Sequence, residues 1–240
     1  MTDVFADWSK AQLALVEQAL TQWVAADAPD ALRDAMRYAV LDGGKRLRAL
    51  LVLATAQAVQ GSHEAAMRAA CAIELIHGYS LAHDDMPCMD NDLLRRGKPS
   101  CHVQYGEAGA LLAGDGLQTQ AFELLTPEPS DGVPAAMQAS LCRILAKASG
   151  ATGMVGGQAV DMALTGASGA TLDQLKAMHA MKTGALITAA CDVGDVVVLA
   201  PVFRQHVVEH VVDAHGPEET PLGVEHREGE QVVRRKKSGD

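Results

Sequence analysis

Apolar residues recur at spacings of three and four along nearly all of the chain from residue 4 to about residue 192. That spacing places them on one face of an α-helix, and no strand-like segments alternate with the helical ones. Alanine, leucine and methionine are plentiful while aromatic residues are only 3% of the 240 residues, which favours closely packed helices over sheets. The sequence therefore predicts an all-α bundle. The expected helices span residues 5–26, 31–41, 45–60, 64–85, 106–126, 134–150, 152–164 and 171–191.

The composition changes near residue 193. Alanine occurs 39 times in residues 1–192 and twice in 193–240, whereas valine occurs 10 times before this point and 12 times after it. The valine pairs suit the preceding helical pattern poorly, and the last stretch is polar and rich in glycine and proline. We therefore expect a helical domain over residues 1–192 and an aberrant, poorly ordered tail over 193–240.

Charge and hydropathy exclude several classes of function. The net charge of −10 is the wrong sign for a nucleic-acid surface. There is no apolar run long enough for a membrane span and no signal-peptide pattern, which predicts a cytoplasmic protein. The five cysteines are scattered and never in CxxC spacing, so we expect reduced thiols rather than disulfides or a zinc site.

The stretch HDDMPCMDNDLLRRG (83–97) holds four aspartates within nine positions and then two arginines. Carboxylates this close raise each other's pKa unless a cation neutralises them. Mg2+ takes oxygen ligands and commonly shares them with substrate phosphates. The cluster predicts a metal–diphosphate site, and the alternative is a solvated acidic loop.

Helical geometry supports the metal site. His77 and Asp84 are seven residues apart, so they share one face of a helix at a separation of about 10.5 Å. Asp90 would point about 120° away from Asp84 on an unbroken helix. Because Pro87 disrupts helical hydrogen bonding, we expect the helix to distort at residues 86–89 and to return Asp90 toward Asp84 and Asp85.

Two basic segments accompany the acidic one. Arg95 and Arg96 precede Gly97 in an expected turn, and arginine binds phosphate bidentately. The stretch GGKRLR (43–48) places Lys45, Arg46 and Arg48 at a helix start, where the helix dipole and backbone N–H groups also favour anions. One acidic and two basic sites together predict two diphosphate ligands.

At this point the chain resembles the trans-isoprenyl diphosphate synthase family, and most closely its bacterial farnesyl diphosphate synthase members. The matching stretches are GGKRLR (43–48), residues 73–102 around the aspartate cluster, YGEAGALLAGDGLQTQAF (105–122), GGQAVD (156–161) and KTGALI (182–187). The resemblance implies an isoprenoid-synthase-type helical bundle around a central cavity, usually as a homodimer. It also implies Mg-dependent ionisation of dimethylallyl or geranyl diphosphate, condensation with isopentenyl diphosphate, and loss of a proton.

The resemblance implies roles residue by residue. Asp84, Asp85 and Asp90 would hold Mg2+ on the allylic diphosphate. The isopentenyl diphosphate would bind Lys45, Arg48, His77 and Arg96. Arg95, Lys182 and Thr183 would contact the allylic diphosphate, with Gln158 and Asp161 lining the same cavity. Without the resemblance, His77 could equally be a core histidine and the two lysines ordinary helix-end residues.

Product length follows from the resemblance too. Tyr79 is the bulky residue five positions before the first aspartate, and Pro87-Cys88 matches a two-residue insertion in the motif. That arrangement implies a C15 product, farnesyl diphosphate, with geranylgeranyl diphosphate as the second choice.

The resemblance stops near the composition change. The family's second aspartate-rich motif, DDxxD, and the lysine after it have no counterpart here, since Asp192, Asp195 and Asp213 have the wrong spacing. A truncated or frameshifted C-terminal part, with incomplete C-terminal helices, would explain this loss. The alternative to an active synthase is then a catalytically incomplete member or non-catalytic subunit with little turnover. A further alternative is an acidic helical metal-binding protein, which leaves the arginines unexplained.

Overall fold

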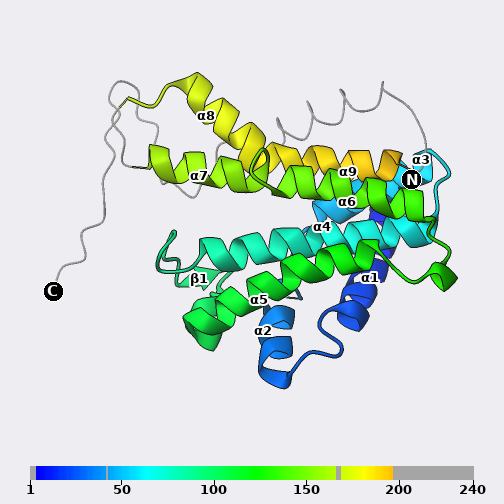
Figure 1. Cartoon of the computed structure of the whole chain (residues 1–240), viewed down its shortest axis with the longest axis horizontal. Coiled ribbons are helices and arrows are strands. Elements are labelled where there is room, and N and C mark those ends of the chain that lie inside the picture. Colours follow the sequence, from blue (N-terminus) through cyan, green and yellow to red (C-terminus); the bar gives the residue numbers. More distant parts are fainter. Residues whose placement is uncertain (1–3, 42, 166–168, 197–240) are drawn as a thin grey trace.

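The computed structural model describes residues 4–41, 43–165 and 169–196, and these form helices packed in two layers (Figure 1). The first layer contains α1 (Val4–Trp23), α2 (Asp30–Val40), α4 (His63–Asp84) and α5 (Cys101–Leu125). α6 (Ala135–Ser149), α7 (Met154–Leu164), α8 (Leu172–His179) and α9 (Ala185–Asp195) form the second, and α3 (Leu47–Ala58) packs against both α4 and α9. The prediction of an all-α fold is confirmed. The described ranges also contain a hairpin of two-residue strands, β1 (Leu94–Arg95) and β2 (Lys98–Pro99), and the short 3-10 turn η1 (Pro129–Asp131).

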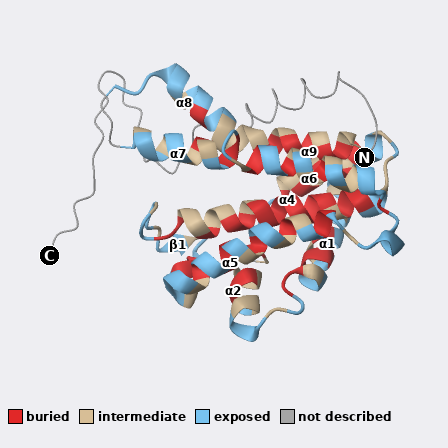
Figure 2. Ribbon diagram, in the orientation of Figure 1, coloured by how far each residue is buried: buried red, intermediate tan, exposed pale blue. Residues whose placement is uncertain are grey.

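α4 is the central helix of the fold. It contacts α5, α3, α9 and α2, and its buried residues fall on every face of the helix. Most of the visible part of α4 is coloured as buried in Figure 2. Ser62 begins it by accepting a hydrogen bond from the N–H of Ala65. A Cβ at Gly78 would lie 2.7 Å from Val40 Cγ2, so the glycine lets α2 cross close to α4. Because α4 is buried and closely packed, its C-terminal end is held in a fixed position.

Two expected helices differ from the observed ones. The expected helix over 171–191 is wrong as a single element, because a π-helical turn, η2 (Ala180–Gly184), separates α8 from α9. α5 begins at Cys101 rather than near residue 106, and it kinks at Gly106, whose φ of 77° only glycine adopts readily. The expected start therefore corresponds to the kink and not to the helix end.

The end of the helical part lies just beyond the expected boundary. α9 continues to Asp195, three residues past 192. Residues 197–240 lie outside the described residues, so the aberrant tail stays a prediction. Across the described ranges, no helix is both long and apolar enough to cross a bilayer.

Candidate active site

The aspartates gather where α4 ends. α4 stops at Asp84, and the chain turns through Pro87 so that the N–H of Asp90 donates to the carbonyl of Asp84 at 2.9 Å. The N–H of Asp92 donates in the same way to the carbonyl of Asp85 at 3.1 Å. The helix thus breaks over the expected residues, and Asp90 returns to Asp84 as the sequence predicts.

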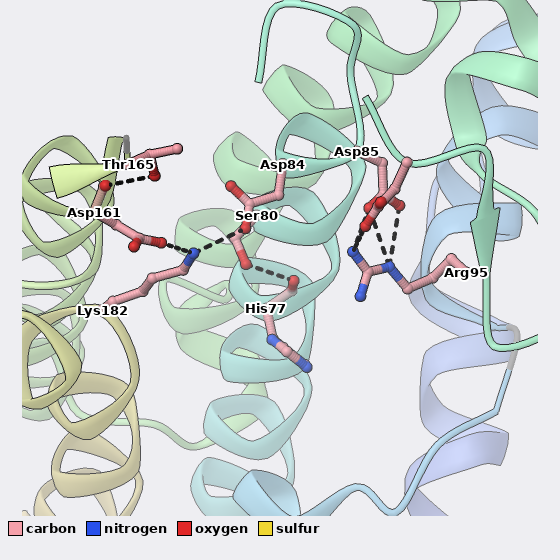
Figure 3. Close-up of polar contacts among 9 residues, drawn as sticks. His77, Ser80, Asp84, Asp85, Arg95, Asp161, Thr165 and Lys182 are labelled. Atoms are coloured by element: carbon pink, nitrogen blue, oxygen red, sulfur yellow. Dashed lines mark hydrogen bonds and ion pairs between the residues drawn. The ribbon is translucent and has the colours of Figure 1, made fainter. Parts of the chain in front are cut away.

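Asp84 and Asp85 point to opposite sides of the helix end (Figure 3). Asp84 faces Lys182, with 3.5 Å between Oδ2 and Nζ. Asp85 is buried and accepts from Arg95, whose Nε lies 3.1 Å from both carboxylate oxygens and whose Nη2 also donates to it. Among the described residues, no three acidic, histidine or cysteine side chains are grouped closely enough to hold a metal ion. The three aspartates are therefore not brought together as one ligand set, and Asp85 instead fixes an arginine.

The remaining pair, Asp84 and Asp90, suits a cation. Burial raises the pKa of Asp84, and repulsion from Asp90 adds to the shift while Lys182 opposes it. The pKa of Asp90 is raised in the same way by burial, with Lys182 again opposing. The negative charge of these two carboxylates is only partly neutralised by Lys182, which suits a hard divalent ion such as Mg2+. Mg2+ needs only one or two protein carboxylates when phosphate oxygens supply its other ligands.

Lys182 reaches this pair from the π-helical turn η2. Its Nζ lies 2.6 Å from Oδ2 of Asp161 on α7 and so links α7 to α4 (Figure 3). Burial lowers the pKa of Lys182, but Asp161, Asp84 and Asp90 together outweigh that effect and raise it, so the side chain stays charged. π-helical turns commonly occur at functional sites.

The GGQ motif lets α7 approach η2. A Cβ at Gly157 would lie 2.6 Å from the Cα of Lys182, which is backbone and cannot rotate aside. Replacement of Gly157 by alanine should therefore lower the free energy of unfolding by about 1–3 kcal/mol through overpacking and should separate Lys182 from Asp161. Gly184→Ala is the control, because its nearest neighbour lies 3.8 Å away. Equal melting temperatures for the two variants would contradict the close approach.

The other expected cavity residues are buried or half-buried. Both amide atoms of Gln158 and the hydroxyl of Tyr79 are buried with no hydrogen-bond partner in the part of the chain that the structure describes. Tyr79 meets the His83 ring edge-on at 5.7 Å between centroids. Thr183 lies beside Lys182 in η2 and is half-buried. A buried amide with both polar atoms in this state, as at Gln158, fits a site for a polar ligand.

A cationic cluster lies next to the aspartates. Arg96 donates to the carbonyl of Gly43, and a Cβ at Gly44 would come within 3.0 Å of its guanidinium, so the two basic segments meet at these glycines. Arg96 and Gly97 both have positive φ, 53° and 78°, which matches a type I′ hairpin turn between β1 and β2. The turn places Arg95 at the aspartates and Arg96 at the 43–48 segment.

Arg48 and His77 complete this cluster, with the exposed Lys45 beside them in the chain. Nε of Arg48 is buried and has no hydrogen-bond partner within residues 4–41, 43–165 and 169–196, and burial lowers the pKa of its guanidinium. Burial also lowers the pKa of His77 well below 6.5, and the charges of Arg48 and Arg96 lower it further. His77 is therefore a neutral imidazole beside arginines whose positive charge is not fully neutralised by nearby carboxylates. Such a site favours binding of an anion.

This histidine predicts a pH dependence of stability. Below about pH 6.5 the unfolded chain binds a proton at residue 77 that the folded chain does not, so the free energy of unfolding falls as pH falls, by at most about 1.4 kcal/mol per pH unit. His77→Gln should remove this contribution, whereas the exposed His63→Gln should leave it in place. Denaturant titrations from pH 5 to 8 measure the slope, and the same slope in wild type and His77→Gln would refute the account.

Sequence reasoning placed Arg46 with the phosphate-binding cations, and that assignment is wrong. Its guanidinium is buried and fully engaged by Glu17, Glu74 and the carbonyl of Val40. The overlooked signal is Glu74 in the apolar run CAIELI, because a carboxylate there needs a buried counter-ion.

Comparison with known proteins gives consistent matches. The sequence model for polyprenyl synthetase matches residues 29–215. The farnesyl diphosphate synthase of Bacillus subtilis is 42% identical over 207 residues, which is 80% of this chain and 70% of that protein. The Geobacillus stearothermophilus farnesyl diphosphate synthase is 46% identical over 76% of this chain, but the chain spans only 62% of that relative. The crystal structure of an FPP/GFPP synthase from Zymomonas mobilis superposes with a TM-score of 0.77 at 39% identity, covering 87% of this chain and 82% of that one.

Proposed function

The chain belongs to the polyprenyl synthetase family, and from that premise we propose that it condenses dimethylallyl or geranyl diphosphate with isopentenyl diphosphate to give farnesyl diphosphate. The named synthase relatives support this prenyltransferase activity over the catalytically incomplete alternative. The observation that carries the proposal is the Arg95-Arg96 hairpin, which joins an acidic site at Asp85 to a cationic site at Gly43.

The acidic site is proposed to take the allylic diphosphate. Asp84 and Asp90 would hold Mg2+, and their raised pKa values reflect the charge that such an ion would neutralise. When bound, Mg2+ supplies Lewis-acid stabilisation of the departing diphosphate. Lys182 and Arg95 lie on either side of the end of α4 (Figure 3). Both would donate to the same diphosphate, and donors that are already oriented stabilise charge that develops in the reaction. Asp85 is assigned to positioning Arg95, although the resemblance counts it as a metal ligand.

The cationic site is proposed to take isopentenyl diphosphate. Arg48 has an unpaired Nε, and neutral His77 can donate or accept beside it. Lys45 and Arg96 add charge at the rim of the site. Binding the second substrate here brings two diphosphates to neighbouring sites on α4, which fixes the orientation that a bimolecular condensation needs.

Two finer assignments also remain proposals. Tyr79 is proposed to limit the product to C15, because its bulky side chain is buried and lies on α4, the helix that also carries Asp84. A homodimer is proposed from the family, and the exposed apolar side chains of α5 suit such an interface: Val103, Leu111 and Leu112.

Product analysis tests the proposed function. The purified chain, supplied with isopentenyl diphosphate, geranyl diphosphate and Mg2+, should form a C15 product identified by chromatography and mass spectrometry. A C20 product would move the assignment to geranylgeranyl diphosphate. A folded chain that binds both substrates without forming product would be the catalytically incomplete alternative, and a folded chain that binds neither would overturn the proposal.

A further inference from the structure

An ion triad of Arg46, Glu74 and Glu17, of which the first two are buried and Glu17 is partly exposed, lies at the start of α3, outside the groups that the proposed chemistry uses. Arg46 is only 6% exposed, and its Nε and Nη2 lie 2.7 and 3.3 Å from the two carboxylate oxygens of Glu17 on α1. Its Nη1 lies 3.2 Å from Glu74 on α4, and Nη2 also donates to the carbonyl of Val40 at the end of α2. One side chain therefore ties α1, α2 and α4 to the 43–48 segment.

The backbone at Arg46 is as constrained as its side chain. Its φ of 46° and ψ of 34° are left-handed, a conformation that costs a non-glycine residue energy unless its surroundings impose it. The second oxygen of Glu74 accepts from the N–H of Ala49 at 3.2 Å, so Glu74 also satisfies one free amide at the start of α3. The triad thus fixes both the loop and the first turn of the helix that follows it.

The residues on either side of Arg46 are those proposed to bind diphosphate. Lys45 directly precedes it, and Arg48 is the second residue of α3, with an Nε that has no hydrogen-bond partner among the described residues. Glu74 attracts Arg48 as well, but its carboxylate oxygens are occupied by Arg46 and Ala49. Without Arg46, a buried and uncompensated Glu74 would draw Arg48 into an ion pair, because an unpaired buried carboxylate is costly.

We propose that Arg46 is a positioning residue for isopentenyl diphosphate binding, which holds Glu17 and Glu74 so that Lys45 and Arg48 remain directed at the diphosphate. This inference rests on the proposed function of the neighbouring site. Arg46 itself does not touch the substrate, since all the groups of its guanidinium fork are directed at protein acceptors.

Titration calorimetry with isopentenyl diphosphate, in the absence of metal, tests the proposal on the full chain. Arg46→Met should weaken binding at least about tenfold, as expected when a charge-assisted contact is misplaced. Arg46→Lys should fall between wild type and Arg46→Met, because it keeps the charge and loses the fork geometry. Adding Glu74→Gln to Arg46→Met should restore much of the affinity, since it removes the carboxylate that would capture Arg48. A purely structural role predicts the opposite, a further loss in the double variant.

Controls separate this inference from the proposed function. Arg33→Met removes an arginine of α2 whose ion pairs among the described residues are with Asp30 and Asp34, and it should bind like wild type. If wild type binds no isopentenyl diphosphate, both the proposed function and this inference fail. If wild type binds and the Arg46 variants bind equally well, or the double variant binds no better than Arg46→Met, only this inference is overturned. If Arg46→Met does not fold, the affinity of Arg46→Lys for isopentenyl diphosphate is compared with that of wild type. Weaker binding supports the inference, and equal binding overturns it.

Discussion

Replacing Asp84 with asparagine should lower kcat by at least about 10³-fold, because the proposed ligand of the metal at the leaving group is lost and that stabilisation is worth several kcal/mol. The same change raises the melting temperature of the metal-free chain. The folded pKa of Asp84 lies above 3.8, so its ionised form costs stability at neutral pH, and that cost appears as pH rises through the raised pKa. Asparagine removes this charge, while Lys182 keeps Asp161 as its partner.

Single-turnover rates at saturating Mg2+ and thermal unfolding without metal measure the two effects together. Asp27→Asn, in the exposed turn between α1 and α2, is the matched control and should change neither quantity. A fall in activity together with a lower melting temperature would mean that the asparagine variant is simply misfolded. An activity within tenfold of wild type would remove Asp84 from the reaction.

Replacing Arg48 with methionine raises the KM for isopentenyl diphosphate by about 100-fold, the effect of losing one or two hydrogen bonds to a charged group at 1.5–3 kcal/mol each. The KM for the allylic substrate should change little, because that substrate is proposed to bind Arg95 and Lys182 instead. Methionine fills a similar volume, so packing is kept. Burial lowers the pKa of Arg48, which means that its charge is costly in the folded state, so removing the charge should not lower the melting temperature.

The same variant carries an independent readout. The charge of Arg48 is the largest contribution after burial to the low pKa of His77, so Arg48→Met should raise that pKa, which NMR titration of the imidazole measures. Arg33→Met is again the surface control. An increase in the allylic KM instead of the isopentenyl KM would exchange the assignments of the two sites.

The local parts of the site could be predicted from the sequence because short-range rules decide them. Pro87 ends α4 and returns Asp90 to Asp84, and Arg96-Gly97 forms the tight turn that the arginine–glycine pair suggests. Each of these features depends on residues within one or two turns of each other. The apolar spacing likewise placed α4 to within one residue at each end.

The parts that could not be predicted depend on partners distant in the sequence. Asp84 and Asp85 differ by one position, and only the placement of the hairpin decides that Asp85 receives Arg95 while Asp84 is left to face Lys182. The π-helical turn at 180–184 leaves no mark in the apolar spacing, because it arises where Gly157 admits the backbone of Lys182. Arg46 looked like its cationic neighbours because its acidic partners lie 28 and 29 residues away.

The central claim is that α4 carries two separate diphosphate sites, of which only the acidic one depends on a metal. Titration calorimetry of isopentenyl diphosphate and of a non-ionising allylic thiolodiphosphate, each with and without Mg2+, tests it most directly. The account predicts that isopentenyl diphosphate binds one to one without Mg2+, that Mg2+ strengthens binding of the allylic analogue at least about tenfold, and that both ligands bind at once. Mutual displacement of the two ligands, or an equal Mg2+ dependence for both, would contradict it.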